Sequence, residues 1–600
     1  MSQAKQPDIH QSAVRQQVEK ILAHGLFTRS DRMGRFLRVA VERSLEGRAA
    51  DLKEYLIGVE VFDRKETYDP RVDPIVRVEA RRLRSKLKAY YEGDGCGDPV
   101  VIEFLSGSYA PRIRLPEPAA VAVAIPSVEP GLITVAVLPF ADLSPKPGHE
   151  YFSDGLTEEL IHALTKVPGM RVVAWNTAAQ LRGGQQDIGA IRDRLKAGTA
   201  LTGSVRIASL SDGSPSLRVR AQLIDTETGV YLWSETFDRA MQDVFAIQEE
   251  IARAIVRTLR LQLAPSPGGY EKGATLPARS RSTIGSYDYY LKGRYHWHKR
   301  TPEELASSVQ LFELAIAADP SSALAQTGLA DAYALLVDYG LMSPVEGMPL
   351  AKAAAGRGVE LDPELAEACT SLAMVRCVYD RQWEDAERLY LRAIALNPGY
   401  ATAHHWYGVD FCAMLGRFDE AAAELEIAGQ LDPLSAIIRE GSAFLKMLQR
   451  DYDGAVRAYR ELAEFDPSFY KAYTSLGRVY AQQGKYPDAI AMLEKGRMLA
   501  GNIPNILGAM GQVYALAGEP ERAREAIGKL AELSRRTYVP ASVFAIVHLG
   551  LGENERALDC LEKGCDRRDT PLTALKVHPI YDPLRSHPRF HGLLKRLGLE

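Results

Sequence analysis

A helical pattern with one apolar side and one basic side lies between residues 71 and 91. Its apolar side is predicted from three- and four-residue spacing and consists of Val76, Ala80, Leu83, Leu87 and Tyr90. The other side carries Arg71, Arg77, Val78, Arg81, Arg82, Ser85 and Lys88. Seven Arg or Lys residues against two acidic residues give this stretch a net charge of +5. Such a helix fits the major groove of DNA, where Arg and Lys reach phosphates and guanine edges.

A β-hairpin is predicted directly after this helix. The turn-forming residues 93–99 lead into an apolar strand over 100–105, and a second strand covers 109–113. Small residues at 106–108 form the tip, where the Ser108 hydroxyl and nearby Arg112 can donate to phosphate oxygens. A recognition helix followed by a basic hairpin predicts a winged helix. The alternative is a solvated basic helix in an ordinary helical domain, because charged faces are usually only that.

The stretch Val76–Leu87 resembles the recognition helix of OmpR/PhoB-type winged helix-turn-helix regulators, and Leu105–Pro111 resembles their wing. Asp51–Gly58 would be the preceding positioning helix, and the likeness extends over about 33–114. This resemblance implies binding to double-stranded DNA and leaves room for a homodimer on DNA. Arg77 and Glu79 stand where that family more often has Asp and His, so its base preference does not carry over.

Alternating and apolar segments in the middle of the chain predict an α/β domain with a mixed sheet. The expected order is βαβαβββα, with strands at 134–140, 170–175, 200–207, 217–225 and 231–237 and helices at 153–164, 188–195 and 244–263. Ser153 or Asp154 is expected to cap the first helix, with Glu158 and Glu159 near its positive end. Segments such as Val135–Phe140 and Trp233–Arg239 resemble the TolB amino-terminal-like domain of bacterial signalling proteins.

The C-terminal half repeats itself with a period near 34 residues. Asp-Pro or Asn-Pro pairs end at prolines spaced 43, 35, 35 and 34 residues apart, namely Pro320, Pro363, Pro398, Pro433 and Pro467. Twelve residues before each lies a small residue: Ser308, Ala351, Ala386, Ala421 and Ala455. Three residues earlier stands a bulky one: Leu305, Met348, Trp383, Phe418 and Tyr452. This pattern is typical of tetratricopeptide (TPR) repeats, which form a groove for a protein or peptide.

No catalytic, cofactor or metal site is predicted. His296 with His298, and His404 with His405, have no third ligand placed nearby, so we interpret these histidines as packing or groove residues. The Gly183-Gly184 turn lacks the Lys and Ser/Thr of a phosphate-binding loop. Chains similar to this one are sometimes fused to a nucleotide cyclase domain, but residues 1–115 are too few to hold it. We therefore expect that the protein is not an enzyme.

Charge and hydropathy refine this picture. The whole chain has a net charge of −4, whereas residues 1–115 contain 21 basic and 17 acidic residues, as expected when one domain alone meets nucleic acid. The six cysteines have no framework spacing and are expected to be reduced core thiols. The apolar run at 119–125 has seven residues, far fewer than the roughly 20 of a membrane helix. With no signal peptide in residues 1–20, these features predict a cytoplasmic protein without a membrane span.

The predicted fold class is a multidomain chain with an N-terminal winged helix (α+β), a central α/β mixed-sheet domain and a C-terminal all-α TPR solenoid. The expected boundaries are 1–115 for a helical lead-in plus the winged helix, 116–131 for a linker, 132–263 for the TolB-like domain, 264–286 for a second linker, 287–570 for about eight repeats and 571–600 for a capping segment. The expected function is a DNA-binding transcriptional regulator with a TPR interaction or sensing module. The alternative is a cytoplasmic TPR scaffold in a signalling pathway that does not bind DNA.

Overall fold

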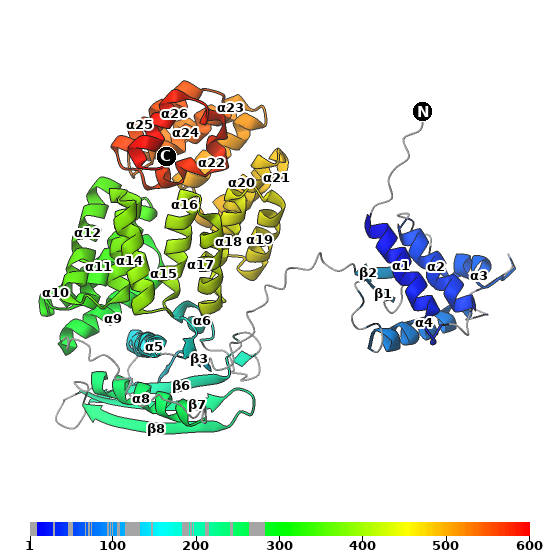
Figure 1. The fold of residues 1–600 in the computed structure, drawn as a ribbon, viewed down its shortest axis with the longest axis horizontal. Coiled ribbons are helices and arrows are strands. Elements are labelled where there is room, and N and C mark those ends of the chain that lie inside the picture. The colour runs from blue at the N-terminus through cyan, green and yellow to red at the C-terminus, as the bar shows by residue number, and fades with distance from the viewer. Residues whose placement is uncertain are drawn as a thin grey trace. The chain divides into compact units, whose positions relative to one another are not determined.

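The computed structural model divides into two compact units, Met1–Pro130 and Gly131–Glu600, which are drawn in Figure 1. The described residues are 9–27, 31–45, 48, 52–65, 68–69, 73, 75–92, 95, 98, 100–104, 109–114, 133–145, 148–167, 169–182, 191–192, 195, 197–209, 215–240, 244–262 and 283–600. The linker expected at 116–131, and the one expected at 264–286 up to residue 282, lie outside them.

The N-terminal unit consists of helices and a two-stranded antiparallel ribbon. Its elements are α1 (Ile9–Ala23), α2 (Asp31–Leu45), α3 (Glu54–Glu60), α4 (Ile75–Glu92), β1 (Val101–Phe104) and β2 (Pro111–Arg114). Residue Val101 pairs with Arg114, so the hairpin predicted after the basic helix is present. The apolar side predicted for α4 is buried and joins one core with residues of α1, α2 and β1.

A single carboxylate joins α1, α4 and the segment before the ribbon. Asp98 accepts hydrogen bonds of 2.5 Å from Gln17, Lys20 and Tyr90. Burial alone would raise the pKa of Asp98, but these donors outweigh it and lower the pKa below its ordinary value. The ionised carboxylate therefore stabilises the arrangement of α1 and α4.

The α/β part of the second unit has a mixed sheet, as predicted. Its strands are β3 (Ile133–Val137), β4 (Ala141–Asp142), β5 (Met170–Val172), β6 (Thr199–Ser209), β7 (Pro215–Asp225) and β8 (Tyr231–Ala240). The order is β5-β3-β6-β7-β8, with β4 on β6; β3 is parallel to β5 and β6, whereas β6, β7 and β8 are antiparallel. Helices α5 (Glu150–Thr165) and α8 (Val244–Gln262) pack against this sheet, and α6 (Trp175–Ala179) follows β5.

Two local predictions in this part are wrong. Helix α5 begins at Glu150, so Ser153 and Asp154 lie inside it rather than capping it, and the Asp154 carboxylate pairs with Arg182 instead. Trp175, predicted at the end of a strand, begins α6. The reason is tertiary, because the backbone N–H of Ala174 donates to the carbonyl of Leu431 far along the chain.

The C-terminal part, within the described residues 283–600, is an array of eight antiparallel helix pairs. The first helices are α9 (Ile284–Lys299), α11 (Ala323–Asp338), α13 (Ala366–Val375), α15 (Ala401–Trp406), α18 (Ala436–Leu448), α20 (Tyr470–Gln482), α22 (Pro504–Leu516) and α24 (Ala541–Gly550). The second helices are α10 (Pro302–Ala318), α12 (Pro344–Leu361), α14 (Trp383–Leu396), α17 (Phe418–Leu431), α19 (Tyr452–Phe465), α21 (Tyr486–Ala500), α23 (Pro520–Leu533) and α25 (Asn554–Asp566).

The predicted small residues of the repeat lie in the interior of the helix array. All five, from Ser308 to Ala455, are fully buried. The first helices of the third and fourth pairs continue as π-helical segments, η3 (Arg376–Asp380) and η4 (Tyr407–Cys412), the latter followed by α16 (Ala413–Leu415). The side chain of Cys377 in η3 donates to the carbonyl of Asp410 in η4, which links these two segments.

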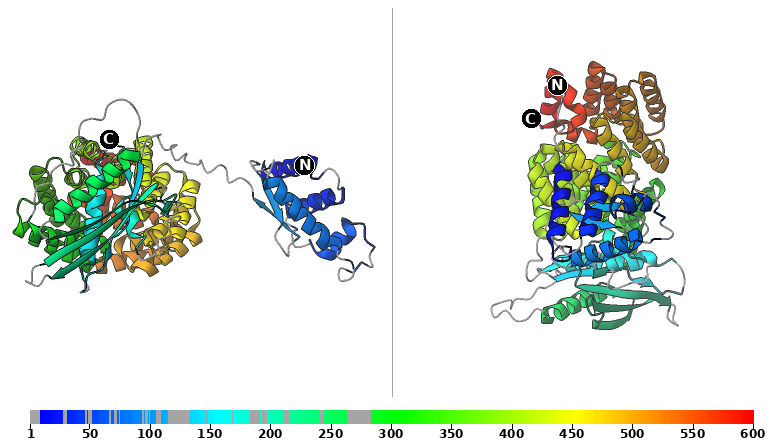
Figure 2. Two further views of the ribbon diagram at one scale, coloured as in Figure 1. Left: turned by 90° about the horizontal axis from the view of Figure 1, so that it is seen from below. Right: turned by 90° about the vertical axis from the view of Figure 1, so that its right-hand side faces the viewer.

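The α/β part covers one edge of the helix array, as Figures 1 and 2 show. This edge consists of loops that lead from one pair to the next. Asp432, between α17 and α18, accepts hydrogen bonds from Asn176 and Thr177. Asn397, between α14 and α15, donates to Thr165. Residues of the first helix pairs and of the sheet also form one hydrophobic cluster, so the two parts share a core.

The C-terminal segment covers the opposite edge, which consists of the turns within pairs. This segment contains η5 (Thr570–Lys576), η6 (Pro579–Leu584) and α26 (Pro588–Leu597). Arg450, between α18 and α19, donates to the carbonyl of Val577 and pairs with Asp582 at 2.8 Å. The indole N–H of Trp383 donates to the carbonyl of Leu597. The segment expected to cap the last repeat therefore reaches back to the middle repeats.

Four of the cysteines, Cys369, Cys377, Cys412 and Cys565, are buried free thiols, as predicted, and Cys560 is a half-buried one. Among the described residues, no helix combines the length and the apolar character needed to cross a membrane.

The buried alanines provide a test of the repeat packing. Ala421 is fully buried in α17, whereas the next residue, Ala422, is exposed. We expect Ala421→Leu to overpack the crossing and to lower the free energy of unfolding by about 1–3 kcal/mol. Ala422→Leu adds the same side chain to the surface and should change it by less than about 0.5 kcal/mol. Urea denaturation of both variants measures this difference, and equal effects would contradict the repeat register.

Candidate functional site

The exposed side of α4 carries most of the residues predicted to contact DNA. Arg77, Val78, Arg81, Arg82 and Ser85 are all exposed, and Val78 keeps 42% of its surface. The other four predicted positions are not described in full. Arg71 and Ser108 lie outside the described residues, and for Lys88 and Arg112 the side chains are not described. The structure thus brings five of the nine predicted site residues to one face of one helix.

Ion pairs on α4 leave its arginines accessible. Arg77 lies 2.9 Å from Glu54 of α3, and Arg82 lies 2.8 Å from Glu79 one turn away. For Arg81 no ion pair is found among the described residues. The two carboxylates are largely covered, but the Arg77 and Arg82 side chains keep 53% and 66% of their surface. All three guanidinium groups can therefore approach phosphate.

Tyr109, two residues before β2, packs against the core of the N-terminal unit and is half-buried. Burial, together with its hydrogen bond to Glu54, raises the pKa of Tyr109 to about 12. The ring therefore packs between the ribbon and α3.

A second group of polar side chains lies on the first helices of the array, the helices that line the inner surface of a TPR solenoid. Lys471 of α20 lies 4.0 Å from Asp338 of α11. Glu440 of α18 accepts long hydrogen bonds from Tyr459 and Ser475. Asp410 of η4 is close enough to interact electrostatically with these charges. Three carboxylates therefore surround one ammonium group.

The pKa values of this inner group are strongly perturbed. Burial, and then the nearby Asp338, raise the pKa of Asp410 to about 7. Burial opposes the charge of Lys471, but Asp338 and Glu440 outweigh it and raise the pKa of Lys471. Burial also raises the pKa of Glu440. A basic side chain of a bound peptide would favour the ionised forms of Asp410 and Glu440, because a carboxylate is stabilised by an opposite charge.

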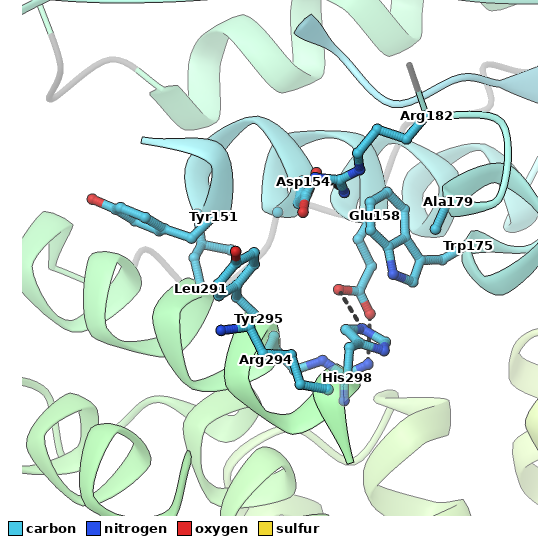
Figure 3. Close-up of a pocket in the computed structure, with 12 residues that line it drawn as sticks. Tyr151, Asp154, Glu158, Trp175, Ala179, Arg182, Leu291, Arg294, Tyr295 and His298 are labelled. Atoms are coloured by element: carbon cyan, nitrogen blue, oxygen red, sulfur yellow. Dashed lines mark hydrogen bonds and ion pairs between the residues drawn. The ribbon is translucent and has the colours of Figure 1, made fainter. Parts of the chain in front are cut away.

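A cavity of about 230 Å³ lies between α5, α6 and α9, and Figure 3 shows its lining side chains. Glu158 of α5 occupies its centre, where one carboxylate oxygen lies 2.5 Å from Arg294 and the other 3.4 Å from the Nε2 atom of His298. Trp175 of α6 stands beside these residues, with its ring 6.0 Å from the His298 ring. The α/β part and the first repeat therefore build this cavity together.

Burial and neighbouring charges shift the pKa values of three side chains in the cavity. Burial would raise the pKa of Glu158, but Arg294 and His298 lower it well below its ordinary value, so the carboxylate is ionised. Burial lowers the pKa of His298 despite Glu158, which favours a neutral ring at pH 7. Burial also raises the pKa of Asp154, against the lowering effect of Arg182.

The sequence pointed to only part of this cavity. It drew attention to Asp154, Glu158 and His298 singly, as helix-terminus or packing residues. The sequence did not indicate a site at Arg294 or Trp175, because the local pattern around them gives no sign that they meet residues more than 100 positions away.

Comparison with known proteins shows that the helix array contains TPR repeats. Two tetratricopeptide repeat family models match residues 378–436 and 446–513. These matches, the eight helix pairs and the buried small residues together identify the repeated part of the chain as TPR repeats.

Two curated relatives match longer stretches. "Putative adenylate cyclase 3" of Rhizobium meliloti is 36% identical over 187 residues, which are 31% of this chain and 30% of that protein. The transcriptional regulator HilA of Salmonella typhimurium is 22% identical over 362 residues, which are 60% of this chain and 61% of HilA. The chain thus spans less than two thirds of the length of either relative.

Solved structures include a tetratricopeptide repeat protein from Parabacteroides merdae, with 17% identity, a TM-score of 0.34, and coverage of 44% of this chain and 99% of that one. Human IFIT1 is 15% identical, with a TM-score of 0.37, over 59% of this chain and 77% of its own.

The raised pKa of Asp410 predicts a pH effect. Between its ordinary value and about 7, the unfolded chain releases this proton while the folded protein keeps it, so folded stability falls as pH rises through that window. Asp410→Asn removes this loss. Its free energy of unfolding, relative to the unmodified protein, should therefore rise by about 1–3 kcal/mol from about pH 5 to about pH 8.

Denaturant titrations at several pH values measure this difference. Asp488→Asn, at an exposed position of α21, is the matched control and should show no such rise. Parallel pH curves for Asp410→Asn and the unmodified protein would refute the assignment.

Proposed function

We propose that this protein is a DNA-binding transcriptional regulator whose TPR array receives a protein or peptide partner. The observation that carries the proposal is the basic, exposed side of α4 followed by the β1–β2 ribbon. In this proposal α2, α3, α4 and the ribbon form a winged helix-turn-helix, with α4 in the major groove and the ribbon tip at the backbone. The name of HilA, a transcriptional regulator that matches 60% of the chain, supports the same function.

Electrostatics supports DNA as the ligand of the N-terminal unit. Residues 1–115 are net basic in a chain that is net acidic, which concentrates the attraction for phosphate on one part of the protein. A side chain such as Val78, exposed between arginines, suits the methyl group of a thymine. The proposal includes no enzymatic reaction, because binding alone is sufficient for the proposed roles.

The TPR array supports a second candidate, a scaffold that does not bind DNA. The observation that supports this candidate is the group of charged residues on the first helices of the repeats. These residues could bind a peptide whether or not the protein binds DNA. A direct DNA-binding assay on the whole chain, by fluorescence anisotropy with labelled duplex, distinguishes the two candidates.

Removing two arginines tests the DNA-binding face. In Arg81→Ala/Arg82→Ala, we expect weaker binding and a salt dependence flattened by about one to two units of slope, because each phosphate contact releases about one counterion. Both side chains lie off the buried side of α4, so the fold should persist. Arg35→Ala/Arg38→Ala removes the same charge from α2 and should flatten the slope less. An unchanged slope in the folded α4 variant would favour the scaffold.

Val78 tests base recognition separately from phosphate contact. A preferred sequence is first selected from a pool of random duplexes. Val78→Ala should then weaken binding to the selected duplex by about 1 kcal/mol more than binding to a random duplex, because only the former offers the matching thymine. Arg81→Ala should weaken both by a similar factor. Equal losses for Val78→Ala would show that another face of α4 enters the groove.

A further inference from the structure

The cavity between α5, α6 and α9 has no part in the proposed function. Its walls include the rings of Trp175 and Tyr295 and the aliphatic side chains of Leu291 and Ala179. At 230 Å³ it is smaller than the roughly 300–1,000 Å³ of sites for drug-sized ligands. A cavity of this volume with aromatic and aliphatic walls fits a flat molecule of one or two rings.

Each charged side chain of the cavity lies beside an opposite charge, although the buried Nε–H of Arg294 has no hydrogen-bond partner among the described residues. Both oxygens of Glu158 are engaged, one by Arg294 and the other by His298. Asp154 pairs with Arg182, and Lys299 lies 3.0 Å from Glu304 at the rim. A ligand with a net charge would therefore find no unpaired counter-ion and would lose its hydration without compensation. The charge balance selects an uncharged ligand.

Two polar groups on the walls are free to bind it. Among the described residues, neither the indole N–H of Trp175 nor the hydroxyl of Tyr295 has a hydrogen-bond partner. Both residues are only half-buried, so these groups remain accessible. In Figure 3 the Trp175 nitrogen is turned toward the part of the cavity where Glu158 and His298 lie. A molecule that accepts a hydrogen bond in its ring plane could pair with the indole while its faces contact the aromatic walls.

We propose that this cavity binds a small uncharged heteroaromatic molecule that accepts a hydrogen bond from Trp175. Such a ligand would touch α5 and α6 of the α/β part and α9 of the first repeat at once. Its binding would stabilise the contact between those two parts, because a ligand stabilises the state that binds it. This inference goes beyond the proposed function and does not depend on DNA binding.

Three pyridines with one ring and different charges test the proposal on the full chain. Nicotinamide is uncharged, nicotinate is an anion, and 3-(aminomethyl)pyridine is a cation. Isothermal titration should show nicotinamide binding about ten-fold more tightly than either charged probe, because only it avoids an uncompensated buried charge. A raised melting temperature should accompany binding. Equal or tighter binding of a charged probe, or no binding of nicotinamide at millimolar concentration, would overturn the proposal.

A cavity-filling variant locates the binding. Ala179→Trp should fill the space and weaken nicotinamide binding by about ten-fold or more, since the ring would occupy the ligand's place. Ala317→Trp, at an exposed position of α10, is the matched control and should bind normally. Undiminished binding by folded Ala179→Trp would refute the site.

If Ala179→Trp does not fold, a smaller change at Trp175 tests the same site. Trp175→Phe keeps an aromatic wall and removes only the indole N–H group, so binding should weaken by about five-fold, the usual effect of one lost hydrogen bond. Circular dichroism confirms that each variant is folded. Nicotinamide binding that is unchanged in folded Trp175→Phe would exclude the indole as the donor and overturn the proposal.

Discussion

The apolar cluster between the sheet and the first repeat is the constraint on which the second unit depends. Leu291 and Phe312 of the repeat join the same core as Leu156 of α5 and the buried side of β7. This packing needs Gly155, because a Cβ atom there would lie 2.4 Å from a methyl group of Leu291. The close approach of α5 and α9 in turn sets the distance between Glu158 and Arg294.

Much of this architecture could be predicted from local patterns. The small residues from Ser308 to Ala455 revealed the repeats, because each must sit where two helices cross closely. The apolar stripe of α4, the apolar run of β1 and the alternation of β7 identified these elements. Such patterns are readable because burial repeats with the period of the helix or strand.

Contacts between distant segments could not be predicted in this way. Trp175 follows a strand-like sequence, yet it begins a helix because the neighbouring backbone bonds to the repeat at Leu431. Glu158 looked like a charge placed for the helix terminus, but its position is determined by Arg294 and His298. Local periodicity carries no information about pairs more than 100 residues apart, so the cavity could not be predicted although Asp154, Glu158 and His298 had each been singled out.

The contacts along both edges of the array change how it must unfold. A free solenoid behaves as a chain of neighbours, in which single repeats can be lost or added at modest cost. Here Asp432, between the fourth and fifth repeats, accepts hydrogen bonds from the α/β part, and Arg450 in the fifth repeat donates hydrogen bonds to the C-terminal segment. Loss of one repeat would shift every later contact out of place. The array should therefore unfold as one cooperative body, and its length should tolerate no change by a single repeat.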